Sequence, residues 1–148
     1  MHRSLRTLLA GALCFAVFAC EEDNAPGGTE EFDATLSAVS EVPPTGITAT
    51  GAATFTARGN LLIWEVAVVG IDSVTAGHIH AGAAGANGGI MVDLGLAETG
   101  IGFTGTLAID SAAVADSVLV RLRNGTAYVN VHTTAFPAGA IRGQVVAQ

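Results

Sequence analysis

The stretch AATFTARGNLLIWEVAVV, residues 52–69, decides the fold. It holds two runs rich in aliphatic, aromatic and β-branched residues, 52–57 and 61–69, which are typical of strands. Between them stands Arg58-Gly59-Asn60, and Gly and Asn tolerate the positive φ that a tight turn requires. The stretch therefore predicts a β-hairpin.

The second strand of this hairpin is apolar on both of its faces. Because side chains alternate along a strand, one face carries Leu62, Trp64, Val66 and Val68, and the other carries Leu61, Ile63, Glu65, Ala67 and Val69. This pattern predicts a central strand that is nearly buried on both sides. Glu65 has two interpretations: it lies near the sheet surface or pairs with an arginine, or it orients a histidine.

Similar short segments recur along the chain and are separated by clusters of Gly, Pro, Asn and Ser. This spacing predicts an all-β fold, and we expect a single Greek-key-like β-sandwich or barrel of about seven or eight antiparallel strands. One short helix should precede the last two strands. The other expected strands include 32–38, 90–94, 102–109, 127–133 and 140–147.

The segment 112–123 has two interpretations. Asp110 and Ser111 can cap a helix, apolar residues recur at spacings of four, and Gly125 stands just past the end. We therefore predict a helix over 112–123. The alternation of its last apolar residues leaves a strand as the alternative.

The first twenty residues are typical of an export signal. Arg3 and Arg6 precede an apolar run, 8–18, that is too short to span a bilayer. The run ends in Val17-Phe18-Ala19-Cys20, which resembles the bacterial lipobox, whose cysteine is lipidated and becomes the first residue. We predict a lipoprotein signal peptide over residues 1–19 and lipidation of Cys20. The alternative is an ordinary signal peptide with an incidental Cys20.

The composition of the chain after this leader limits the classes of partner that it can bind. Cys14 lies inside the leader, so Cys20 becomes the only cysteine and no internal disulfide can form. Residues 20–31 are acidic and turn-rich, which predicts a flexible tether to a domain over 32–148. Loss of Arg3 and Arg6 leaves four arginines against 13 acidic residues and changes the formal charge from -7 to -9, which argues against nucleic acid as a partner.

We expect an exported monomer, anchored to the bacterial membrane and facing the periplasm or the cell surface, with an unknown protein or matrix partner.

Three histidines carry the strongest indication of chemistry. His78 and His80 lie one residue apart, so they share a face of a strand, and one neighbouring strand can bring His132 beside them. Neutral imidazole is a good ligand for zinc and copper, which predicts a metal site with Asp93 or water as the fourth ligand. The alternative is that His78 or His132 hydrogen-bonds the glycine-rich loop 81–89 and fills the rim of the sandwich without metal.

Two further residues stand close to this site in the sequence pattern. Asn130 shares its strand face with Tyr128 and His132, and it either orients a ring or a loop, or makes a hydrogen bond at the sheet surface. Arg142 either pairs with Glu65 or another carboxylate, or attracts an anion towards the histidines. No Ser/His/Asp arrangement is evident, so we predict no catalytic residues and favour a binding module over an enzyme.

Three blocks of sequence occur in a recognisable order. They are Leu36-Ser37-Ala38 with Glu41-Val42-Pro43-Pro44, then AGHIHAG at 76–82, then AYVNVHT at 127–133 followed by PAGAIRGQV at 137–145. With these blocks the mature chain resembles a CHRD domain, the module named after chordin and found in many bacterial secreted proteins and lipoproteins. The resemblance implies a cell-envelope binding module without an assigned enzymatic activity. A structural or adhesive surface module without metal is the alternative.

A more distant resemblance is to the copper/zinc superoxide dismutase-like β-sandwich. It rests on the strand with Trp64, on the H-x-H pair, and on Ala138-Gly139-Ala140-Ile141-Arg142. This resemblance carries over only to His78, His80, His132 and Arg142, and it implies a copper-dependent redox protein as a further alternative. The bridging histidine, the other zinc ligands and the disulfide of that family have no counterpart here.

Overall fold

The computed structural model describes residues 28–148, and these residues are mostly β-strand. The predicted signal peptide, Cys20 and most of the predicted tether lie outside the described residues. The predicted all-β fold with one short helix before the last strands is confirmed. The elements are β1 (Thr29–Ser37), η1 (Ala38–Ser40), β2 (Thr50–Arg58), β3 (Leu61–Ile71), β4 (Val74–Ala81), β5 (Ile90–Asp93), β6 (Phe103–Ala113), α1 (Asp116–Arg123), β7 (Ala127–Thr133), β8 (Ile141–Gln144) and β9 (Val146–Ala147).

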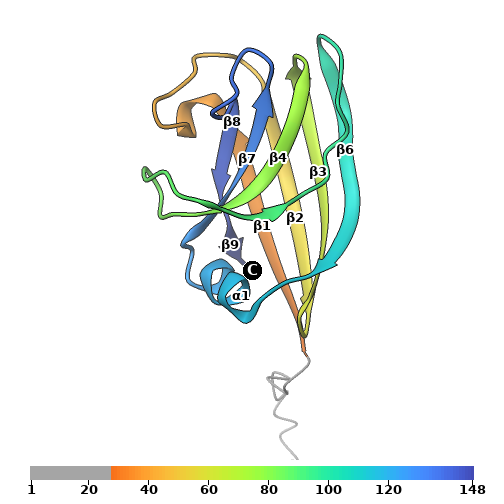
Figure 1. Cartoon of the computed structure of the whole chain (residues 1–148), viewed down its shortest axis with the longest axis vertical. Helices are drawn as coiled ribbons and strands as arrows, with labels where there is room; N and C mark the ends of the chain where they lie inside the picture. The colour runs from red at the N-terminus through yellow and green to blue at the C-terminus, as the bar shows by residue number, and fades with distance from the viewer. Residues whose placement is uncertain (1–27) are drawn as a thin grey trace, which may run out of the picture.

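The strands form one antiparallel sheet in the order β5-β4-β7-β8-β1-β2-β3-β6, with β9 paired to β1. Figure 1 shows this sheet curled into a half-barrel, with α1 near the C-terminus. The segment after β5 spans the open side, because Leu94 N donates to Gly77 O of β4 and Ala97 N donates to Leu107 O of β6. The two ends of the sheet are therefore linked by backbone hydrogen bonds.

The hairpin of β2 and β3 is confirmed, with Arg58 opposite Leu61 and Gly59 at φ 59° in the turn. The expectation that β3 is buried on both sides is wrong. Its inner face is buried, whereas Val69 on the other face is 57% exposed. A single sheet that curls upon itself buries only its concave side, and β3 is the last strand but one.

Glu65 lies on the exposed face of β3, as the surface interpretation predicted. It accepts a hydrogen bond from Thr106 Oγ1 at 3.3 Å. It does not orient a histidine, because β3 lies several strands away from β4 in the order of the sheet.

Helix α1 begins later than the sequence predicts. It starts at Asp116, and Ala115 at its N-cap offers no side-chain hydrogen bond. Asp110 and Ser111 do not cap it but lie in β6, opposite Trp64 and Ile63 of β3. The ladder between β6 and β3 runs on to Ala113, and these backbone hydrogen bonds outweigh the local capping preference.

The predicted strand 140–147 is divided in two. Its first part, β8, lies between β7 and β1 and pairs with both, and its second part, β9, pairs with β1. The division falls at Val145, whose N–H donates to Ala127 O at 3.0 Å. The C-terminal segment therefore connects β7 to β1.

One hydrophobic core fills the concave side of the sheet, where β1, β2, β3, β4, β7 and β8 meet α1. Its large members include Phe32, Leu36, Phe55, Leu62, Ile79, Leu122 and Ile141. Within residues 28–148, no helix has the length and hydropathy needed to cross a membrane.

Candidate metal centre

The three histidines lie on the outer face of the sheet, where β4 and β7 run side by side. Ile79 and Val131 belong to the core and are fully buried, so the alternation of side chains turns His78, His80 and His132 away from the core. In the ladder, His78 stands opposite Asn130. The structure thus brings together the three histidines, and one ligand nitrogen from each lies within 4.8 Å of the others.

The outer face is not open to solvent here. His80 and His132 are each 8% exposed, and His78 is half-buried. The glycine-rich loop 82–89 contacts His80, and the connection 134–140 between β7 and β8 contacts His132. These loops convert a sheet surface into a partly enclosed site.

The hydrogen bonds of His132 determine its tautomer. Its Nδ1 lies 3.1 Å from Pro137 O, which can only accept, so Nδ1 carries the proton. The Nε2 of the neutral ring is then an acceptor, and His78 Nδ1 donates to it at 3.0 Å. His132 therefore directs a lone pair towards His78, and His78 Nε2 also keeps a lone pair.

His80 is oriented in the same way. Its Nδ1 donates to Gly88 O at 3.0 Å, so its Nε2 carries a lone pair. This Nε2 is buried and has no hydrogen-bond partner among the described residues. Histidines that bind metals usually donate their other ring N–H to a backbone carbonyl or carboxylate, which is the arrangement of both His80 and His132.

Burial favours the neutral form of the two enclosed rings. It lowers the pKa of His80 and of His132 below the ordinary histidine value of 6.5. The positive charge that His78 would carry lowers both further, while the bonds to Gly88 and Pro137 raise them. Neutral imidazole is the form that binds a metal.

Tyr128 and Arg142 support His80 from the side. The Tyr128 ring stacks on the His80 ring with centroids 5.0 Å apart and planes 10° apart. The Arg142 guanidinium carbon lies 3.5 Å from the Tyr128 centroid, which is a cation–π contact. Tyr128 stands opposite His80 in the ladder. The sequence pattern alone does not predict this contact, because the partner of each residue depends on the register of β4 and β7.

Arg142 is buried and holds the glycine-rich loop. It donates to Asn87 Oδ1 and to Ala86 O, both at 3.1 Å. It makes no ion pair with Glu65, so that interpretation is wrong. The guanidinium thus contacts both the loop and Tyr128. Arg142 therefore supports the loop that encloses the histidines.

Asn130 and Asp93 lie near the histidines in different ways. Asn130 is buried, and its Nδ2 donates to Ala138 O at 3.4 Å, so it contacts the connection 134–140 instead of a ring. Asp93 of β5 stands opposite His78 in the ladder but is exposed, and its Oδ1 accepts from Gly95 N at 2.9 Å. It does not belong to the cluster of ligand atoms.

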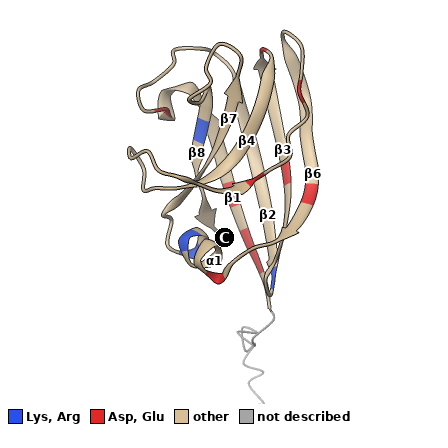
Figure 2. Ribbon diagram, viewed as in Figure 1, with Lys and Arg blue, Asp and Glu red and all other residues tan. Residues whose placement is uncertain are grey.

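Acidic residues dominate the surface of the described chain. Figure 2 shows them on β1, β3 and β6, whereas basic residues stand on β8, on α1 and at the end of β2. On α1, Arg123 forms a two-bond ion pair with Glu30 of β1, both bonds measuring 2.6 Å. A surface of this sign attracts cations towards the domain.

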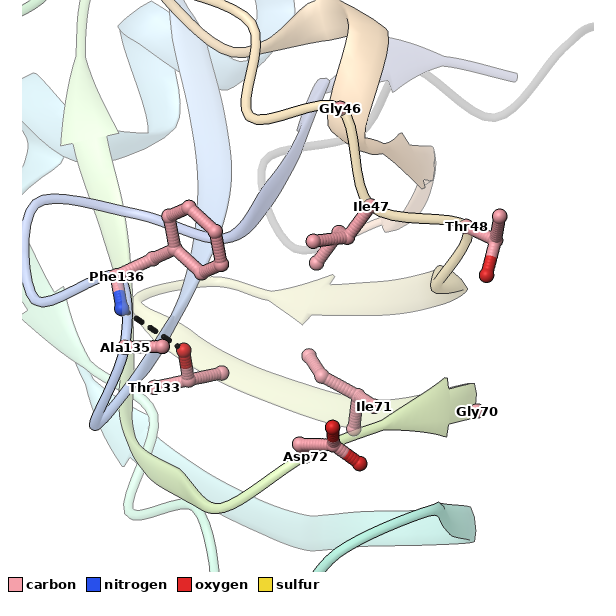
Figure 3. Close-up of a pocket in the computed structure, with 9 residues that line it drawn as sticks. All are labelled: Gly46, Ile47, Thr48, Gly70, Ile71, Asp72, Thr133, Ala135 and Phe136. Carbon is pink, nitrogen blue, oxygen red and sulfur yellow. Dashed lines mark hydrogen bonds between the residues drawn. The ribbon is translucent and has the colours of Figure 1, made fainter.

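A mostly apolar pocket of about 370 Å³ lies at the start of the connection 134–140, close to the end of β7. In Figure 3, Phe136 and Ile47 face one another across it and Ile71 lies beneath. Phe136 N donates to Thr133 Oγ1 at 3.1 Å, and the ring packs against the core. Phe136 therefore holds the connection next to Pro137, whose carbonyl contacts His132.

Comparison with known proteins agrees with the three sequence blocks. Searches of the curated proteins and of the solved structures found no match to the chain. The family model of the CHRD domain matches residues 32–145. This range includes all three histidines and the strands β1 to β8, apart from the first three residues of β1. The chain belongs to the CHRD domain family.

Proposed function

We propose that this chain is a lipid-anchored module of the bacterial cell envelope that binds a divalent transition metal, copper or zinc, through His78, His80 and His132. The observation that carries the proposal is the buried Nε2 of His80, which has no hydrogen-bond partner among the described residues and belongs to a cluster whose three ligand atoms lie within 4.8 Å of one another. The rings of His80 and His132 are both held at Nδ1 by backbone carbonyls. Membership of the CHRD domain family supports a binding module without enzymatic activity.

A small shift of the three histidine rings would bring their ligand nitrogens to the spacing that a bound metal requires. Three nitrogens around zinc, each at about 2.0 to 2.1 Å, lie about 3.3 Å apart in a tetrahedral site. The ligand atoms here lie within 4.8 Å of one another. A metal would replace the proton shared by His78 and His132, and three histidines leave a further position for water or a partner's side chain.

Metal loading tests this proposal. Purified protein is incubated with zinc or copper, passed through a desalting column and analysed for metal, beside the double variant His78→Ala, His80→Ala. We expect about one metal ion per chain in the unmodified protein and loss of the bound metal in the double variant. Asp116→Asn is the control, because it removes an exposed carboxylate outside the cluster.

The affinity for the metal should also fall as the pH drops below about 6.5, because protonated imidazole cannot bind metal.

Equal and low metal contents in the first protein and the double variant would contradict the proposal. The histidines would then serve only to hold the loops, and the domain would be a structural or adhesive surface module. A metal signal that does not change with pH would point to ligands other than histidine.

The anchor rests on the sequence Val17-Phe18-Ala19-Cys20. Expression in bacteria fed an alkyne-bearing fatty acid should label the protein, and Cys20→Ser should abolish the label. Label that persists in this variant would overturn the assignment of Cys20, whichever result the metal analysis gives.

A further inference from the structure

Two buried acceptor oxygens lie next to one another beside the metal site. Glu41 is 6% exposed and Asn130 is 4% exposed, and neither Glu41 Oε1 nor Asn130 Oδ1 has a hydrogen-bond partner among the described residues. A buried acceptor without a donor has lost its hydrogen bonds to water and gained none in return, which is unfavourable. Two such atoms at one place call for a donor that both can share.

Gly139 shows how closely the two oxygens approach. A Cβ on Gly139 would stand 2.7 Å from Glu41 Oε1 and 2.6 Å from Asn130 Oδ1, with Asn130 Nδ2 closer still. Both oxygens therefore converge on one point, and they do so because Gly139 has no side chain. The residues come from three separate places: Glu41 follows η1, Asn130 lies on β7, and Gly139 precedes β8.

We propose that Glu41 keeps its proton in the folded protein and donates it to Asn130 Oδ1, so that Glu41 is a positioning residue for His132. One O–H group satisfies both orphaned oxygens, because the protonated carboxyl becomes a donor and the amide oxygen accepts. The inference about His132 as a ligand rests on the proposed metal function, whereas the proton on Glu41 does not.

The path from Glu41 to His132 is short. Asn130, held at Oδ1 by Glu41, donates its Nδ2 to Ala138 O. The neighbouring carbonyl, Pro137 O, accepts from His132 Nδ1. On the other side, Thr45 Oγ1 donates to Ala140 O at 2.8 Å and ties the segment after Glu41 to the same connection. Loss of the Glu41 donor would free the connection that orients the ring.

The charges around Glu41 are few. Burial raises its pKa above the ordinary glutamate value of 4.5, while the Arg142 guanidinium on β8 and the backbone of Val42 act in the opposite direction. Arg142 is already bound to the loop 82–89 and makes no ion pair with Glu41. His132 lies two residues beyond Asn130 on β7, and burial lowers its pKa, which favours the neutral ring.

The first test measures the proton directly. Carbon-13 NMR of the purified protein, with carboxyl signals assigned by a Glu41→Gln comparison, follows each glutamate from acid to neutral pH. We expect the carboxyl of Glu41 to titrate above the ordinary glutamate value of 4.5. Titration of Glu41 in the ordinary glutamate range would overturn the proposal, since a water molecule would then bridge an ionised carboxylate and the amide.

The second test measures the effect on His132. Glu41→Gln keeps an N–H donor for Asn130 Oδ1, whereas Glu41→Ala removes it, and Glu31→Gln is the control. With zinc as the probe and a chromophoric chelator as competitor, we expect Glu41→Ala to weaken binding about tenfold and Glu41→Gln to stay near the unmodified protein. Equal weakening by Gln and Ala would overturn the positioning role.

The two tests separate this inference from the proposed function. If no variant binds zinc, the metal proposal fails, and the titration of Glu41 still decides where the proton lies. The tautomer of His132 then replaces zinc affinity as the readout: nitrogen-15 NMR should show Nδ1–H in the unmodified protein and in Glu41→Gln, and a mixture in Glu41→Ala. A single unchanged tautomer in Glu41→Ala would contradict the proposal.

Discussion

At the scale of the residue, Trp64 links the two ends of the curled sheet. It lies on β3 within the core, and its Nε1–H donates to Leu94 O at 3.1 Å on the segment that spans the open side. The sequence predicted a buried Trp64 from the alternation in β3. It could not predict the bond to Leu94, because that contact joins segments 30 residues apart.

We expect Trp64→Ala to lower the free energy of unfolding by about 3 to 5 kcal/mol, because a large cavity would open in the core. Trp64→Phe keeps most of the apolar volume but leaves Leu94 O without its donor, so its loss should be smaller. Denaturant titration followed by circular dichroism measures both. A midpoint for Trp64→Ala close to that of the unmodified protein would contradict the central place of this ring.

For the histidines, the local sequence pattern predicts which face of the strand they occupy but not how their rings are oriented. The period of two along a strand was sufficient to predict that His78 and His80 share a face, and the structure places His132 beside them. The orientation of each ring depends instead on Gly88 and Pro137, which belong to loops. No periodicity determines the path of a loop, so the tautomers could not be predicted.

At the scale of the element, the close approach of β8 and β1 depends on Gly143. A Cβ at this position would stand 2.2 Å from Thr35 O, a backbone atom of β1 that cannot turn aside. The sequence contains the motif Arg142-Gly143-Gln144, but only the pairing of strands distant in sequence explains why glycine stands there.

We expect Gly143→Ala to destabilise the protein by about 1 to 3 kcal/mol, because the added methyl would force β8 away from β1. The matched control is Gly100→Ala, where a Cβ meets nothing within 4 Å and the change should stay below about 0.5 kcal/mol. Thermal unfolding of the two variants measures the difference. Similar melting temperatures would show that β8 and β1 have room to separate.

The boundaries of α1 and of the last strands show the limits of element prediction. Residues 112 and 113 were predicted as helix, yet they extend β6, because hydrogen bonds to β3 are available there. Segment 140–147 was predicted as one strand, yet it divides at Val145 into β8, which lies between β7 and β1, and β9, which pairs with β1. In both cases tertiary pairing overrode a local preference that was correct for the neighbouring residues.

At the scale of the whole molecule, the sheet buries its concave side as the core and uses its outer face at β4, β7 and β8 for polar residues under loops. Burial there lowers the pKa of His80 and His132. In the unfolded chain both would titrate near 6.5, so below that pH the unfolded state binds more protons. Their contribution to stability is therefore complete above about pH 6.5 and is lost as the pH falls through the lowered values.

We expect the free energy of unfolding without metal to fall between about pH 7 and pH 5, and to fall less in the double variant His80→Gln, His132→Gln. Glu41 has a raised pKa and acts in the opposite direction, since its contribution declines as the pH rises from 4.5. Glu41 is present in both proteins, so its contribution cancels when the free energy of unfolding of one is subtracted from that of the other. Parallel profiles would mean that neither histidine is desolvated in the folded state.

The sequence by itself determined the all-β class, the hairpin of β2 and β3, the shared face of His78 and His80, and the membership of a family, because these depend on short periodic patterns and on contiguous blocks of residues. Only the tertiary structure decided the partners of Arg142, the stacking of Tyr128 on His80, and the meeting of Glu41 with Asn130 at Gly139. These contacts join segments that are distant in sequence, such as Asn87 and Arg142, 55 residues apart. Their physical cause is the register of the strands and the path of the loops, which local propensity does not specify.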